Sequence, residues 1–179
     1  MKKWSEIKQA TLDKLFLEEA EAQQQGYLAK FQYLANECLT LIANGVKPRV
    51  GVYETTIVKD YDVINMPDDF LSFYVNGAPN PELSYVTDKT VSGKAGDYKI
   101  YYNALWKEIT KDDIINDTIL PIDVSVLNCL PTYMASQLLS QDDVQRSAIL
   151  KNEFELLLAR LDTEIMYESN HFKSEGGWY

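Results

Sequence analysis

The sequence has a single histidine and only two cysteines among its 179 residues. His171 alone cannot supply a zinc site of the histidine and cysteine type or a Ser-His-Asp triad. Cys38 and Cys129 each lie among apolar residues of a predicted helix. This setting favours buried thiols in a reducing compartment over a disulfide framework. We therefore predict a protein that is not an enzyme and that needs no cofactor or metal.

Basic residues and long apolar runs are also scarce. The chain has 17 lysines and arginines against 27 acids, a formal net charge of −10. Sequence-specific nucleic-acid binding needs clustered cations, so we do not expect it. No window approaches about 18 uninterrupted apolar residues, and the amino-terminal stretch lacks the apolar core of a signal peptide. We expect a soluble protein that is not exported by this route and has no membrane partner.

Three pairs of adjacent acids could be taken for metal ligands: Asp68-Asp69, Asp112-Asp113 and Asp142-Asp143. Adjacent side chains point in different directions, and each pair lies at a turn or a helix start, where acids are favoured. We interpret all three pairs as caps. The segment SGKAGD, residues 92–97, lacks the earlier glycine and the hydroxyl residue after lysine of a phosphate loop. It is predicted to be a hairpin turn.

The hydrophobic content of 46% argues against disorder, and the length suits one domain. Apolar residues at three- and four-residue steps predict helices over 5–25, 27–44, 121–139 and 141–167. The last two form a helical hairpin with a polar turn at 140–143. Pro121 suits a first helical turn, and Pro131 predicts a kink or a helix restart. The buried stripes comprise Leu28, Phe31, Leu34, Cys38 and Leu41; Val124, Leu127, Leu130, Met134 and Leu138; and Leu150, Phe154, Leu157, Leu161 and Ile165.

Residues 49–106 change to strand-like alternation rich in valine, threonine and tyrosine, which predicts an inserted small antiparallel β lobe. Strands at 83–87 and 98–102 are expected to form a hairpin across the SGKAGD loop. The fold class is therefore α+β, mainly α: a helical bundle with a C-terminal helical hairpin and this inserted lobe. Residues 1–167 are predicted to form a single domain, and residues 168–179 a tail.

Two groups of aromatic residues are candidate binding elements. A small sheet has two faces that one core cannot cover, so some rings of the lobe are expected at an interface with another subunit or the tail. These candidates are Tyr53, Phe73, Tyr74, Tyr85, Tyr101 and Trp106. The tail ends in an aromatic pair after two glycines, which suits an extended docking peptide. Its candidates are Phe172, Gly176, Gly177, Trp178 and Tyr179. Core packing for the first group and disorder for the second are the alternatives.

Residues 120–167 also carry a family resemblance. A Leu-Pro start leads into an apolar helix ending in MASQLLSQDD, and the helix that follows contains NEFELLLARLD. Upstream lie the segments MPDDFLSFY and YKIYYNALWKEIT. In order and spacing, these segments over residues 60–167 resemble the head-to-tail adaptor proteins of tailed bacteriophages. The likeness is a pattern and includes no invariant motif.

The resemblance implies a structural virion protein at the neck, assembled in the host cytoplasm. Such adaptors form a ring of about twelve copies below the portal and join it to the next tail or neck protein. Their lumen lets double-stranded DNA pass without specific binding, and an extended C-terminal segment inserts into the portal in several of them. Residues 168–179 would then be the portal-docking tail. The alternative from the residues alone is a soluble module that binds a protein or a ligand through its aromatic β surface.

Overall fold

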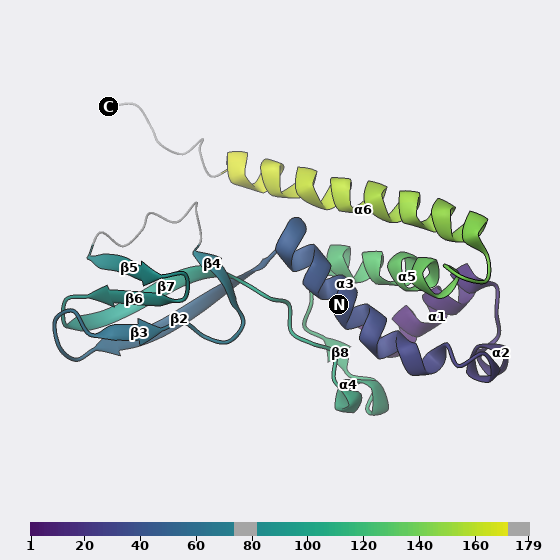
Figure 1. The fold of residues 1–179 in the computed structure, drawn as a ribbon, viewed down its shortest axis with the longest axis horizontal. Coiled ribbons are helices and arrows are strands. Elements are labelled where there is room, and N and C mark those ends of the chain that lie inside the picture. The colour runs from purple at the N-terminus through teal and green to yellow at the C-terminus, as the bar shows by residue number, and fades with distance from the viewer. Residues whose placement is uncertain (74–81, 172–179) are drawn as a thin grey trace. The chain divides into compact units, whose positions relative to one another are not determined.

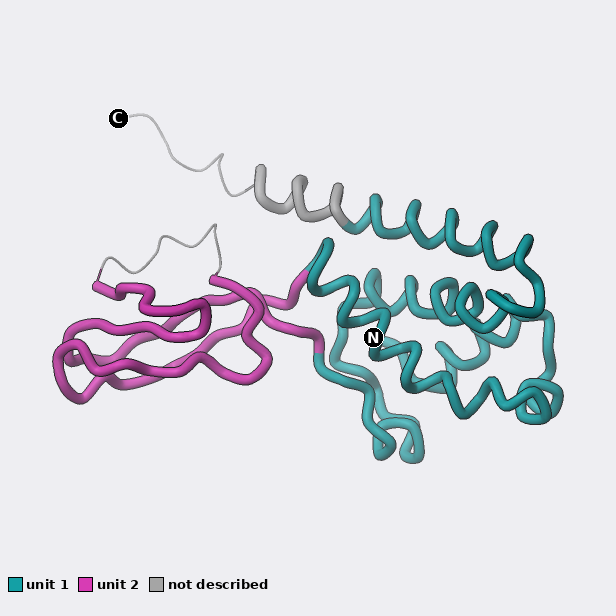
Figure 2. The backbone as a smooth tube through the Cα atoms, viewed as in Figure 1, with its two compact units in different colours: residues 1–47, 107–179 teal, residues 48–106 magenta. Residues whose placement is uncertain are grey.

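The computed structural model describes residues 1–73 and 82–171, with side chains as far as residue 161. The chain divides into two compact units (Figure 2). A helical unit combines residues 1–47 with residues from 107 onward, and a β unit covers residues 48–106. The mixed α+β class with mainly helical structure is confirmed. The single adaptor-like domain over residues 1–167 stays a prediction.

Two separate parts of the chain, one before and one after the β unit in the sequence, form the helical unit (Figure 1). Short strands β1 (Lys2–Lys3) and β8 (Ile119–Leu120) pair antiparallel and join these parts. The described helices are α1 (Trp4–Leu15), α2 (Glu19–Gln24), α3 (Leu28–Gly45), α4 (Lys111–Ile115), α5 (Val124–Leu138) and α6 (Val144–His171).

Helix α5 is the centre of the helical unit because it is buried on nearly all sides. It contacts α1, α3 and α6, and Leu127, Leu130 and Met134 are fully buried. The helix continues through Pro131, so of the two predicted alternatives, a kink or a helix restart, the restart is wrong. Pro121 lies before the helix and not in its first turn. Asp123 caps the helix instead, since its carboxylate accepts a hydrogen bond from a first-turn backbone N–H.

Most predicted stripe residues are buried, including Leu150, Phe154 and Leu161 of α6. Leu41, with 41% of its surface exposed, was assigned wrongly to the core. The buried stripe of α3 continues from Cys38 to Ile42, so position 41 turns away from α5. Val124, at the start of α5, is also exposed. Ile165 lies outside the residues whose side chains are described.

The predicted helix over 5–25 is wrong in one respect, because it consists of two helices. Phe16 ends α1 in the left-handed conformation, with φ 57° and ψ 39°. The backbone N–H groups of Phe16 and Leu17 turn back onto the carbonyls of Asp13 and Leu12, both at 3.2 Å. At the other end, α6 continues to His171. The predicted tail from residue 168 therefore begins inside a helix.

The β unit packs two three-stranded antiparallel sheets around its own core. One sheet has the order β2 (Arg49–Ile57), β7 (Gly96–Ala104), β4 (Phe70–Phe73). The other has the order β3 (Val63–Asn65), β6 (Thr90–Gly93), β5 (Leu83–Thr87). Alternate residues of these strands face inward, as the period of two requires. The buried cluster consists of Ile57, Met66, Phe70, Val91, Tyr98, Ile100, Tyr102 and Ala104.

The predicted hairpin between residues 83–87 and 98–102 is wrong. Strand β5 pairs with β6, and β7 pairs with β2 and β4 in the other sheet. The segment SGKAGD therefore connects two sheets and is not a hairpin turn. Strand β6 is short and carries one large apolar residue, Val91, so its local pattern resembles a loop.

A hydrogen-bonded cluster holds one end of the first sheet. The Tyr102 ring lies over Gly51, the residue opposite it on β2, where a Cβ would meet the ring at 2.4 Å. The Tyr102 hydroxyl donates to Asp69 Oδ1 at 2.8 Å, and the Arg49 guanidinium pairs with the same carboxylate. Burial and then the bond to Asp69 raise the pKa of Tyr102. Glycine at position 51 is therefore required by the close approach of the ring.

Candidate interaction surfaces

The predicted interface aromatics do not form one surface. Tyr53 and Phe73 are half-buried and pack against the core of the β unit. Tyr85 is exposed at the edge strand β5, with its ring centroid 4.0 Å from that of Phe73. Tyr101 is exposed on the outer face of β7, and Trp106 is half-buried. Tyr74 lies outside the described residues, and the interface role of the whole set stays a prediction.

The outer face of β2 and β7 carries a small apolar patch of Val50, Val52 and Tyr101, all exposed. Val52 lies directly opposite Tyr101 in the register of the two strands. The next pair on this face, Glu54 and Lys99, is an exposed salt bridge at 3.0 Å. The two valines were not among the predicted interface residues, although the alternation of β2 places them on the face opposite the core.

The predicted docking tail lies outside the described residues. Its candidates are Phe172, Gly176, Gly177, Trp178 and Tyr179. Their role in binding stays a prediction that rests on the sequence.

Two of the acid pairs, Asp112-Asp113 and Asp142-Asp143, have the capping role that the sequence predicts. The prediction is wrong for Asp69 of the third pair, whose carboxylate binds Arg49 and the Tyr102 hydroxyl instead. Asp113 caps α4, because its carboxylate accepts bonds from the Thr110 N–H and hydroxyl at 2.9 and 2.7 Å, which lower its pKa. Asp143 accepts a first-turn backbone N–H of α6 at 3.0 Å. Asp142 accepts a bond from the Tyr27 hydroxyl; this bond and burial raise the pKa of Tyr27 to about 12. Among the side chains that the structure describes, no three histidine, cysteine or acidic groups are placed to hold a metal ion.

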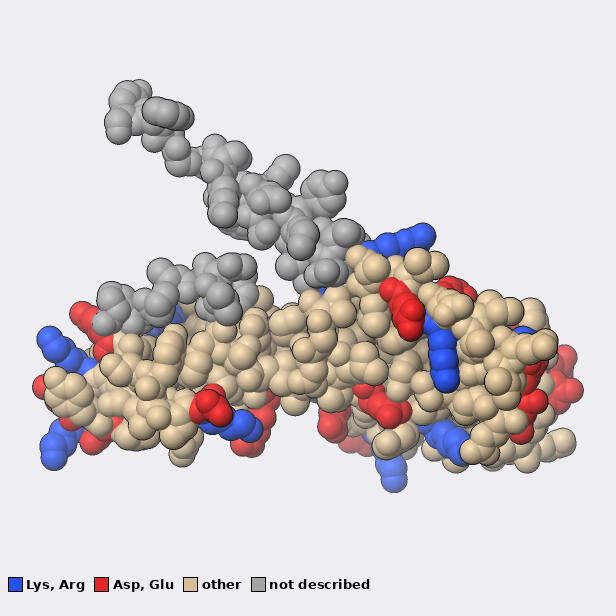
Figure 3. All heavy atoms as spheres, turned by 45° about the horizontal axis from the view of Figure 1, so that its top comes forward, with Lys and Arg blue, Asp and Glu red and all other residues tan. Residues whose placement is uncertain are grey.

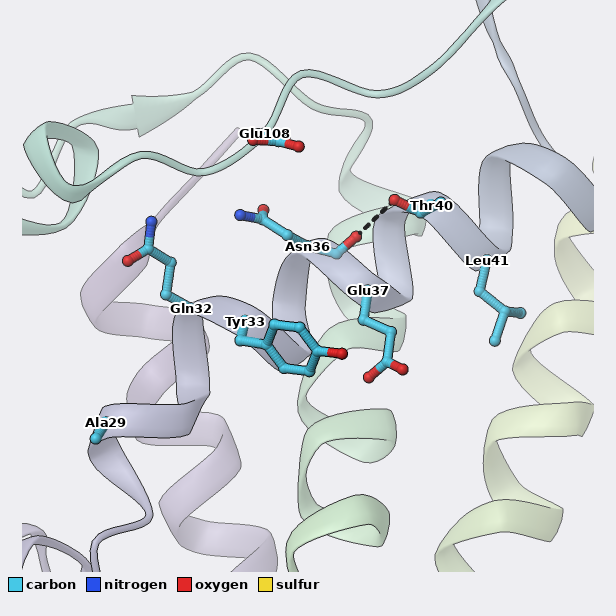
Figure 4. Close-up of a pocket in the computed structure, with 8 residues that line it drawn as sticks. All are labelled: Ala29, Gln32, Tyr33, Asn36, Glu37, Thr40, Leu41 and Glu108. Carbon is cyan, nitrogen blue, oxygen red and sulfur yellow. Dashed lines mark hydrogen bonds between the residues drawn. The ribbon is translucent and has the colours of Figure 1, made fainter.

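An opening lies along the surface of α3, and we call it the α3 hollow (Figure 4). The carboxamides of Gln32 and Asn36 both donate to the Ile109 carbonyl, at 2.9 and 3.0 Å, and Asn36 Oδ1 accepts the Ile109 N–H. These bonds hold the segment that carries Glu108 beside the helix. The hollow has a volume of about 690 Å³ and is lined by Ala29, Gln32, Tyr33, Asn36, Glu37, Thr40, Leu41 and Glu108.

The α3 hollow is suited to a group that is both apolar and cationic. Tyr33 is 69% exposed, and Leu41 adds a second exposed apolar surface. The carboxylates of Glu37 and Glu108 are exposed, and among the described residues the lining includes no lysine or arginine. Burial and the nearby Glu37 carboxylate raise the pKa of Tyr133 on α5. Sequence reasoning missed this site because it assigned Leu41 to the core.

A second opening, which we call the Phe16 hollow, lies between the end of α1 and the start of α6. It has a volume of about 430 Å³ and is mostly apolar. The Phe16 ring is 81% exposed, and the Arg146 guanidinium lies 4.5 Å from its centroid. Arg146 also donates to the Lys14 carbonyl at 2.8 Å, which satisfies an open carbonyl of the last turn of α1. The lining residues are Asp13, Lys14, Phe16, Arg146, Ile149, Leu150 and Glu153.

Charges of both signs are interspersed over the face shown in Figure 3. The described residues of that face form no continuous basic stripe of the kind that nucleic-acid binding requires. Among the described helices, none combines the length and the apolar character needed to cross a membrane. No protein-family model matches the sequence, and no curated protein matches it significantly.

Proposed function

We propose that this chain is a head-to-tail adaptor of a tailed bacteriophage, a structural virion protein that forms a ring below the portal. About twelve copies would join the portal to the next tail or neck protein, with DNA passing through the lumen. The observation that carries the proposal is the order of segments over residues 60–167 that resembles this family. The helical hairpin of α5 and α6, with its acidic turn, supports it.

The charge of the chain fits passage of DNA without specific binding. A net charge of −10 repels the phosphates, so a lumen with this character lets DNA slide instead of holding it. Many weak contacts multiplied by symmetry give such a ring its stability, and no cofactor is needed. The protein would be assembled in the host cytoplasm and located at the virion neck.

Labelling of virus particles tests the proposal directly. We expect a gold-labelled antibody against this chain to mark the single vertex between head and tail in particles from a lysate of its source. Label absent from particles, with the protein free and monomeric, would contradict the adaptor function. The second candidate, a soluble binding module, would then be favoured by the exposed apolar patch of Val50, Val52 and Tyr101.

Removal of residues 171–179 is expected to leave the fold intact and to abolish attachment to the portal. The reason is that the aromatic pair at its end would supply the docking anchors, while the described cores involve none of these residues. Attachment is measured by co-sedimentation with portal rings, and the fold by circular dichroism. A matched control replaces Lys173 and Glu175 by alanine, keeps the aromatic anchors and should still attach. Unchanged attachment of the truncated chain would refute the docking role.

A further inference from the structure

Phe16 closes α1 as a left-handed C-cap, but its residue type is unusual at such a position. A phenylalanine at φ 57° is strained, because its Cβ crowds the following carbonyl, and this position normally takes glycine or asparagine. The surrounding sequence, LDKLFLEEAEA, favours a continuous helix and contains no glycine or proline. The strained residue also exposes a large apolar ring to water. Strain of this kind is typical of functional positions, where another requirement maintains it.

We propose that the Phe16 ring of one copy binds in the α3 hollow of a second copy of this chain. This inference rests on the proposed function, because it names the contact between neighbouring subunits that a ring requires. The α3 hollow, at about 690 Å³, has room for a phenyl ring and part of the adjoining surface. The exposed ring of Tyr33 and the side chain of Leu41 provide its apolar contacts.

The two hollows are complementary in charge at Arg146, although Asp13 and Glu153 also line the Phe16 hollow. The ring of Phe16 carries the Arg146 guanidinium on its face, and the lining of its hollow also includes Lys14. Lys14 pairs with Glu153 at 2.6 Å, so Arg146 is the cation better placed to meet a partner. Its own acidic neighbour, Asp143, is 3.9 Å away. The α3 hollow offers the carboxylates of Glu37 and Glu108, and such a match selects the partner and its orientation.

The contact joins two different surfaces of the helical unit. The Phe16 hollow is built by α1 and α6, whereas the α3 hollow is built by α3 and the segment before α4. Their lining residues, all in the described part of the chain, do not overlap. A contact between unlike surfaces leaves one of each free on every pair of copies. It therefore propagates to a closed ring or an open filament, whereas a contact between like surfaces stops at a dimer.

Engineered cysteines test which surfaces meet. Both native cysteines are buried. We expect oxidation of a mixture of Asp13→Cys and Ala29→Cys chains, which keep the Phe16 and Tyr33 rings, to give a disulfide-linked pair containing one chain of each kind. Neither variant should cross-link alone. A dimer of Asp13→Cys alone, or no cross-link at the highest soluble concentration, would overturn the proposal.

A second variant separates association from folding. Phe16→Gly should keep or raise the midpoint of thermal unfolding, because glycine adopts this conformation without strain, and should weaken self-association at least tenfold in sedimentation. The control Leu156→Ala removes an exposed apolar residue that lines neither hollow, and should leave association unchanged. Unchanged association of Phe16→Gly would also overturn the contact. Cross-linking without gold label at the vertex would retain the contact and reject the adaptor function. Gold label at the vertex without cross-linking would reject the contact and retain the adaptor function.

Discussion

Replacement of Leu130 by alanine is expected to lower the free energy of unfolding of the helical unit by about 3–5 kcal/mol. Leu130 has no exposed surface and lies on α5, which α1, α3 and α6 all contact. Truncation to alanine removes the transfer free energy of three buried carbon atoms and leaves a cavity that three surrounding helices cannot easily fill. A loss of this size is a large part of the total stability of a typical domain.

The measurement is equilibrium unfolding in urea, followed by far-ultraviolet circular dichroism, for the wild type and two variants. The control is Leu156→Ala on α6, since Leu156 is 65% exposed and its truncation should change stability by no more than about 0.5 kcal/mol. A loss below about 1 kcal/mol for Leu130→Ala would contradict the central position of α5 in the core.

Replacement of Gly51 by alanine is expected to destabilise the β unit by about 2–3 kcal/mol. The new Cβ would lie 2.4 Å from the Tyr102 ring, well inside van der Waals contact. The ring cannot simply move aside, because it is buried and its hydroxyl is bonded to Asp69. Either the ring leaves its position or β2 separates from β7.

Thermal unfolding of the full chain measures this effect, with Gly45→Ala as the matched control. Gly45 has open space around its Cβ position and lies at the end of α3, so alanine there should be neutral or stabilising by up to about 1 kcal/mol. The double variant Gly51→Ala with Tyr102→Ala should lose less than the sum of the two single losses, because the clash needs both side chains. Strict additivity would show that the ring does not constrain residue 51.

The periodic parts of the chain could be predicted from the sequence, because their burial follows from local spacing. Leu127, Leu130, Met134 and Leu138 lie on the predicted face of α5, and the polar turn after it separates the two helices of the hairpin. The break at Phe16 could not be predicted. One of the groups that stabilise it, the Arg146 guanidinium, comes from α6, 130 residues later in the chain.

Pairing between distant strands was also beyond local reasoning. The pattern of residues 96–104 identifies a strand but does not say that its neighbours are β2 and β4. Local sequence also did not show which aromatic residues of the candidate surfaces are exposed. Tyr53 and Tyr101 are equally aromatic, yet opposite positions in the alternation leave one half-buried and the other exposed. The α3 hollow depends on hydrogen bonds between Asn36 and Ile109, which no local pattern indicates.

The division of the helical unit into two separate stretches of sequence affects the order in which the chain folds during synthesis. Helices α1 and α3 are made first, but the helix that covers their apolar sides, α5, follows the whole β unit. Residues 48–106 contain a core of their own, so we expect them to fold once they leave the ribosome. We expect the apolar sides of the earlier helices, with residues such as Ile7 and Phe31, to stay uncovered until residues 124–138 emerge.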